Sequence, residues 1–168
     1  EPVIAAEALG AFEDAGAQDV LNVQSNGTVI FSAERPTWAA RDVLGRLQRA
    51  SGYTGEVVVR SEDWIRQTLD EIEPWWEGVE ICLFDARAPL PVEAPWTDDV
   101  SCLNVFVLDA KHAVTSWWDP AHGSPSNPVL TKQLGVPVTC RGLHTMNRVH
   151  ARLLSLSIRD LAAEDEYF

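Results

Sequence analysis

The sequence predicts an α+β fold with mainly antiparallel sheets, organised as two small halves over residues 1–60 and 61–168. Helical and strand patterns follow one another irregularly, and strands come in hairpins, which is typical of α+β proteins rather than of strict strand–helix–strand repeats. The composition is globular, with 46% hydrophobic and 23% charged residues in a chain of 168 residues. A chain of this size and composition can bury one sizeable core or two small ones that pack together.

In the first half, local patterns predict two helices and three strands. Apolar residues at helical spacing indicate each helix, and a glycine follows each one as a stop. The first two strands are separated by Asn-Gly, which favours the positive φ angles of a tight hairpin turn. The expected elements are a helix over 2–15, strands over 20–23 and 28–31, a helix over 37–51 and a strand over 56–60.

In the second half, a capped acidic helix start is followed by a strand and then by a loop with three prolines, residues 85–101. Two further strands and a short helix come next. A last amphipathic helix is marked by Met146, Val149, Leu153 and Leu156. The expected elements are a helix over 61–73, strands over 79–84, 103–108 and 113–118, a helix over 129–134, a strand over 136–140 and the last helix.

Three stretches resemble the bacterial family called domain of unknown function 1697. They are the helix and hairpin of residues 8–31, the segment 57–63 and the segment 130–145, where Leu134-Gly135-Val136-Pro137, Arg141 and Thr145 match the family pattern. The resemblance implies two ferredoxin-like α/β-plait halves packed together, and it implies no activity. The chain departs from the family where Gly142-Leu143-His144 replaces an Asn-Trp-Asn run, and where the Pro-rich loop replaces a helix.

The family usually opens with a strand that precedes the point where this chain begins. The resemblance therefore leaves open whether the first half lacks its first strand. An incomplete sheet would present an unpaired edge, and such edges favour pairing with another chain. A homodimer is one outcome that follows from this feature.

Composition argues against several classes of function. The formal net charge of −12 opposes general nucleic-acid binding and docking on anionic membranes. No apolar run has the length of about 20 residues that a bilayer requires. The chain has an odd number of cysteines at wide spacing, which predicts reduced, mostly buried thiols and a cytoplasmic location. They are Cys82, Cys102 and Cys140. Nucleotide-binding, zinc-binding and hydrolase motifs are absent, so we assign no cofactor.

Charge is segregated along the chain. Residues 120–159 contain five basic residues and no Asp or Glu, a formal charge of +5 within an otherwise strongly acidic protein. These basic residues are Lys132, Arg141, Arg148, Arg152 and Arg159. The last three fall on one side of the final helix, because their spacing matches the helical repeat.

This segregation predicts an anion site near the start of the last helix. The candidate ligand-binding residues are Arg141, His144, Thr145, Arg148 and Arg152, since guanidinium groups and a helix N-terminus both favour a phosphate or carboxylate. The alternative is that these arginines pair with the protein's own carboxylates or are solvated, which is the more frequent outcome for such residues. The sequence leaves both interpretations open.

Two spacings of Asp and His, Asp109 with His112 and Asp119 with His122, place possible metal ligands together. Both pairs lie in predicted turns, where these residues are common, so we assign no metal site. The pairs Trp75-Trp76 and Trp117-Trp118 suggest one exposed ring each, because adjacent strand residues point to opposite faces. Packing in the core is the alternative role of these rings.

Three functions are compatible with these features, and the sequence leaves open whether the chain is an enzyme. The first is a binding module for a small anionic or aromatic ligand, or for a protein partner. The second is a small enzyme that uses His144 or His112 as an acid–base group, since histidine titrates near neutral pH. The third is a self-associating structural protein.

Overall fold

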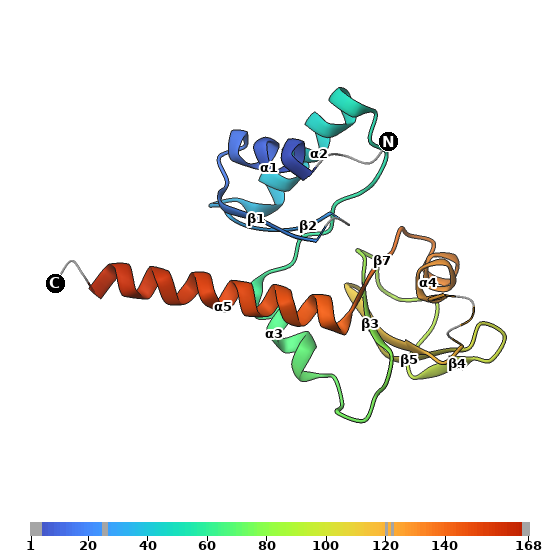
Figure 1. Cartoon of the computed structure of the whole chain (residues 1–168). Coiled ribbons are helices and arrows are strands. Elements are labelled where there is room, and N and C mark those ends of the chain that lie inside the picture. The colour runs from blue at the N-terminus through green and yellow to red at the C-terminus, as the bar shows by residue number, and fades with distance from the viewer. Residues whose placement is uncertain (1–4, 25–26, 120, 122, 166–168) are drawn as a thin grey trace. The chain divides into compact units, whose positions relative to one another are not determined.

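The computed structural model describes residues 5–24, 27–119, 121 and 123–165, with side chains over 7–23, 27–119, 121 and 123–157. Within these residues it contains five helices and two antiparallel sheets, of two and five strands (Figure 1). This confirms the predicted α+β class with antiparallel sheets. The chain divides into two compact units, unit 1 over residues 1–62 and 148–168 and unit 2 over residues 63–147.

Unit 1 contains a β-hairpin and two helices, as the local patterns predict. Its two strands pair antiparallel, with Leu21 opposite Ile30, while Ser25 and Asn26 of the predicted turn lie outside the described residues. The second helix begins with a proline in its first turn and ends at Gly52, whose φ of 68° is the left-handed value that favours glycine. The elements are α1 (Ala5–Asp14), β1 (Gln18–Gln24), β2 (Thr28–Ser32) and α2 (Pro36–Ser51).

The strand predicted over 56–60 is wrong: the residues of that segment form neither a helix nor a strand. Val57 and Val59 instead pack their side chains against the unit 1 core, around Phe12 and Val43. The β-branched residues therefore serve burial, and the backbone of this segment pairs with no strand of the two described sheets.

Unit 2 is built on the five-stranded sheet, whose strand order is β4-β5-β6-β3-β7 with every neighbouring pair antiparallel. Two helices, α3 and α4, lie before and within this run of strands. The elements are α3 (Glu62–Asp70), β3 (Val79–Leu83), β4 (Trp96–Asp98), β5 (Leu103–Leu108), β6 (His112–Trp117), α4 (Ser126–Leu134) and β7 (Thr139–Gly142).

The Pro-rich segment 85–101 contains no helix, as predicted, but it includes strand β4, which the sequence did not indicate. Trp96 of this short strand pairs with Val105 of β5 and so extends the sheet by one edge strand. The peptide bonds before Pro89 and Pro95 are cis. The ferredoxin-like plait itself stays a prediction, because unit 1 has two described strands and the segment 85–101 of unit 2 forms no helix.

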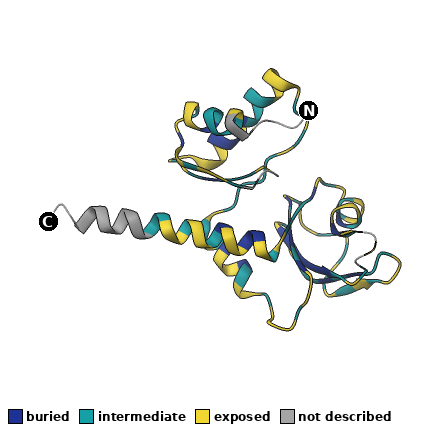
Figure 2. Ribbon diagram, in the orientation of Figure 1, coloured by how far each residue is buried: buried dark blue, intermediate teal, exposed yellow. Residues whose placement is uncertain are grey.

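The core of unit 2 lies between the sheet and helix α4. Leu130 of α4 is fully buried and belongs to the same cluster as Phe84, Leu103 and Val105 of the sheet side. Buried residues are concentrated on the central strands in Figure 2. Burial of each such side chain contributes about 1.5–3 kcal/mol to stability.

Helix α5 (Leu143–Asp165) begins in unit 2, and its residues from Arg148 onwards belong to unit 1. Two hydrogen bonds tie this later part to other unit 1 residues. Arg148 donates from Nη2 to the Val23 carbonyl at 3.2 Å, and Ser157 donates to a Glu62 carboxylate oxygen at 3.3 Å. No helix in the described part of the chain has both the length and the apolar character needed to cross a bilayer.

Candidate functional site

The five residues of the predicted anion site divide between the two units. Arg141 of β7, with His144 and Thr145 in the first turn of α5, belongs to unit 2, whereas Arg148 and Arg152 belong to unit 1. The Thr145 side chain is buried, and His144 is exposed.

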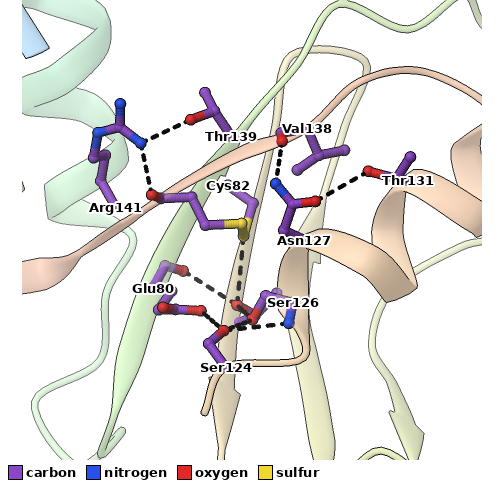
Figure 3. The surroundings of a disulfide bond; sticks show 11 residues. Glu80, Cys82, Ser124, Ser126, Asn127, Thr131, Val138, Thr139 and Arg141 are labelled. Atoms are coloured by element: carbon purple, nitrogen blue, oxygen red, sulfur yellow. Dashed lines mark hydrogen bonds between the residues drawn. A yellow bond between two sulfur atoms is a disulfide. The ribbon is translucent and has the colours of Figure 1, made fainter. Parts of the chain in front are cut away.

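The Arg141 guanidinium is engaged by its own strand. Its Nη1 donates to the hydroxyl of Thr139 at 2.7 Å and to the carbonyl of Cys140 at 2.9 Å (Figure 3). Arginine has five N–H donors, so these contacts fix the orientation of the group without using all of them. Arg141 thus braces the edge strand β7.

Arg148 and Arg152 lie one turn apart on α5, and both are exposed. Among the described side chains neither forms an ion pair, although the chain carries 25 acidic residues. The side chain of Arg159, the third member of the predicted stripe, lies outside the described residues. Arg148 and Arg152 thus place two positive charges on an exposed part of α5, with no carboxylate partner in the part of the chain whose side chains are described.

His112 at the start of β6 is buried between two carboxylates. Its Nε2 lies within hydrogen-bond distance of a Glu71 oxygen, at 3.1 Å. Its Nδ1 also lies 3.1 Å from Asp109 Oδ1, but this second contact does not have the geometry of a hydrogen bond. The Trp64 ring meets the imidazole edge-on, with 5.2 Å between centroids. With both ring nitrogens facing the protein's own carboxylates and the ring buried, His112 is placed to hold the fold together rather than to reach a substrate.

Asp109 organises the turn before His112. Its Oδ1 accepts hydrogen bonds from the backbone N–H groups of Lys111 at 2.6 Å and His112 at 2.8 Å. Partial burial, the largest single influence, raises the pKa of Asp109, but these hydrogen bonds and the charge of His112 together lower it below its ordinary value. Of the other predicted pair, Asp119 and His122, the histidine lies outside the described residues.

The prediction of three reduced thiols is wrong for two of them, because Cys82 and Cys140 form a disulfide. The antiparallel pairing of β3 with β7 places these cysteines directly opposite each other, although 58 residues separate them in sequence. Their wide spacing concealed this relation, since strand pairing is set by the tertiary fold. Cys102 remains a free thiol.

A chain of hydroxyl groups connects the disulfide with the surface (Figure 3). Thr115 lies with its hydroxyl 3.8 Å from the Cys82 sulfur and 3.0 Å from the hydroxyl of Ser126, and all three residues are fully buried. Exposed Ser124 then donates to the Glu80 carboxylate and lies 3.2 Å from Ser126. These contacts satisfy hydroxyl groups that would otherwise be costly to bury.

Each tryptophan pair has one exposed member, but not through strand alternation, because both exposed rings come from residues outside the strands. Trp75 is 72% exposed and Trp118 is 49% exposed. Trp76 stacks on Phe106 with 4.1 Å between centroids, and Trp117 packs against the unit 2 core. Because β3 begins opposite the end of β6, the segments carrying the two exposed rings leave the sheet at the same end.

No family model matches the chain, and neither does any curated protein or solved structure. The resemblance to domain of unknown function 1697 therefore stays a prediction. Any proposal about function has to come from the residues themselves.

Proposed function

We propose that the protein is a binding module for a small anionic ligand, with Arg148 and Arg152 of α5 as its main contacts. The observation that carries this proposal is that both guanidinium groups are exposed and lack a carboxylate partner among the described side chains. The formal net charge of the whole protein is −12, so these two exposed cations differ in sign from most of its charged residues.

Electrostatics support an anion at this position. Like charges at i and i+4 destabilise a helix by about 0.2–0.5 kcal/mol, and a bound phosphate or carboxylate would reverse that effect. Arginine suits this role, because its planar fork presents parallel N–H donors to two oxygens. The bond from Arg148 to the Val23 carbonyl orients one of the two groups in advance.

Thermal unfolding in the presence of inorganic pyrophosphate tests the proposal. At a concentration of about 100 Kd, a ligand that binds only the folded state adds about 2.7 kcal/mol, which raises the midpoint by about 5–10 °C for a chain of this size. We expect Arg148→Gln with Arg152→Gln to remove the shift. The matched control is Arg41→Gln with Arg49→Gln, which removes two exposed arginines of α2.

Equal shifts in wild type and in the α5 double variant would contradict the proposal, as would the absence of any shift with pyrophosphate and with citrate. Pyrophosphate and citrate distinguish a phosphate ligand from a carboxylate ligand. His144, Arg141 and Thr145 stay candidate contacts from the sequence, and His144→Ala in the same assay tests the exposed member of this group.

A second candidate is a surface for an aromatic ring or a protein partner. It is favoured by exposed Trp75 and Trp118, which lie at the same end of the unit 2 sheet. Indole rings stack on sugars, bases and aromatic side chains. Quenching of tryptophan fluorescence by a ligand, lost in Trp75→Ala, would support this candidate, and unchanged quenching in the variant would exclude Trp75 from it.

The enzyme alternative now depends on His144, because His112 is buried between Glu71 and Asp109 and lacks access to a substrate. Self-association is a separate alternative, and sedimentation at high protein concentration decides it. We also retain the bacterial family and its ferredoxin-like plait as proposals, supported by the three matching sequence stretches.

The cytoplasm is the compartment that we propose. The free thiol of Cys102 fits a reducing compartment, whereas a structural disulfide persists mainly in oxidising ones. The Cys82–Cys140 disulfide argues the other way, so a cytoplasmic location requires that this pair is reduced in cells. Trapping thiols with an alkylating reagent during lysis measures this directly, and a fully oxidised pair would contradict a cytoplasmic location.

A further inference from the structure

The surroundings of the disulfide include a third metal-ligating side chain. Glu80 lies two residues before Cys82 on β3, so the two side chains project from the same face of the sheet. Cys140 is opposite Cys82 on β7. The ligand atoms of these three residues all lie within 4.8 Å of one another, and two strands fix their backbones.

This set of atoms suits zinc. Thiolates and a carboxylate are ligands of Zn²⁺, and three protein ligands with one further position is the arrangement of many zinc sites that bind a water or another small molecule. Thiolate sulfur also excludes the hard cations Mg²⁺ and Ca²⁺, which prefer oxygen ligands. In the disulfide state the two sulfurs bond to each other and are not thiolates.

Neighbouring hydroxyl groups hold these side chains in place. Ser124 donates a hydrogen bond to the Glu80 carboxylate (Figure 3). The Thr115 hydroxyl lies 3.8 Å from the Cys82 sulfur. Partners of this kind orient metal ligands, and their loss typically weakens metal binding about 10–100-fold. Cys82 is fully buried, whereas Glu80 and Cys140 are partly exposed, which leaves an approach for an ion.

We propose that reduction of the Cys82–Cys140 disulfide creates a zinc site formed by Glu80, Cys82 and Cys140. The reductant is a dithiol: its two thiols become a disulfide, and each cysteine gains one electron and one proton. Zn²⁺ then displaces the two thiol protons. The oxidised protein lacks the site, so the redox state of one cysteine pair decides whether the chain binds zinc.

The test uses the full chain, either oxidised or reduced with dithiothreitol and desalted under argon. Zinc chloride is titrated in competition with a chromophoric chelator, and Co²⁺ is added separately to record thiolate-to-metal charge-transfer absorption. We expect one equivalent of Zn²⁺ on the reduced protein and none on the oxidised protein at the same concentration. Binding of equal strength in both states would overturn the proposal, because it would reflect the acidic surface.

Three variants locate the site. Cys140→Ser should abolish zinc uptake and the cobalt charge-transfer band, and Glu80→Gln should weaken zinc binding by about tenfold or more while both thiols stay intact. Cys102→Ser is the matched control and should bind as wild type does. Circular dichroism verifies folding, and if Cys140→Ser is unfolded, Glu80→Gln decides: wild-type affinity in that variant overturns the three-residue site.

Discussion

Breaking the Cys82–Cys140 bond should destabilise unit 2 strongly. The bond links β3 with β7 across a separation of 58 residues, which contains β4, β5, β6 and α4. In the chain-entropy description, closing a loop of this length lowers the entropy of the unfolded chain enough to contribute about 4 kcal/mol at 25 °C. Typical domains are stable by about 5–15 kcal/mol, so reduction should remove a large share of the total.

Urea unfolding followed by tryptophan fluorescence measures this loss. Six of the seven tryptophans lie in unit 2 and Trp38 lies in unit 1, so the signal reports mainly on the disulfide-containing unit. We expect the free energy of unfolding to fall by about 4 kcal/mol after reduction, both in wild type and in the control Cys102→Ser. A loss below about 1 kcal/mol would refute the reasoning, because the bond would then not constrain the unfolded chain.

Three further predictions concern single substitutions, and urea unfolding measures the effect of each on the free energy of unfolding. Asp109→Ala should cost about 1–2 kcal/mol at pH 7, at the low end for a carboxylate with two backbone hydrogen bonds because Asp109 is half exposed. Since its folded-state pKa is lowered, this contribution exists above the unfolded-state pKa of about 3.9 and disappears as the pH falls through the folded-state value; a constant difference down to pH 2 would contradict it. Leu130→Ala, at a fully buried position, should cost about 2–5 kcal/mol, against about 0.5 kcal/mol or less for exposed Leu154→Ala, and equal losses would disprove the core assignment. Gly135→Ala should cost about 1–2 kcal/mol because its φ of 67° is left-handed, whereas Gly142→Ala, with no positive φ and open space around its Cβ position, serves as the control; a neutral Gly135→Ala would show that α4 ends differently.

Local sequence patterns predicted most elements because those elements carry their own signals. The hairpin of β1 and β2, the glycine stop after α2 and the amphipathic start of α5 are each specified by residues close together in sequence. The segment 56–60 failed for the opposite reason. Its valines have the composition of a strand, but a strand also needs a partner backbone, and here the side chains are only partly buried and the backbone has no such partner.

Strand β4 was missed because three prolines in its loop indicate irregular structure, and the pairing of Trp96 with Val105 is decided by the adjacent sheet edge. The disulfide was missed for a related reason. Its two cysteines meet through the register of β3 with β7, and no local pattern in a single sequence contains that register. Glu80 could have been suspected, since it shares a strand face with Cys82, but its relation to Cys140 required the fold.

Prediction of the candidate anion site was limited in the same way. Charge segregation pointed to the region that contains Arg148 and Arg152, which are exposed and lack carboxylate partners among the described side chains. It could not separate these from Arg141, whose guanidinium is bonded to Thr139 and Cys140 within its own strand. Sequence gives the charge of a residue, while the fold decides how much of that charge faces solvent.

Because two of the three cysteines pair, the number of free thiols reports the redox state of the molecule. An oxidised chain offers one thiol to an alkylating reagent, that of Cys102, whereas a reduced chain offers three. The mass added to the intact unfolded protein therefore reports the proportion of each form in a mixed sample. A preparation can be sorted in this way before any ligand, metal or denaturant is added, without a single substitution in the chain.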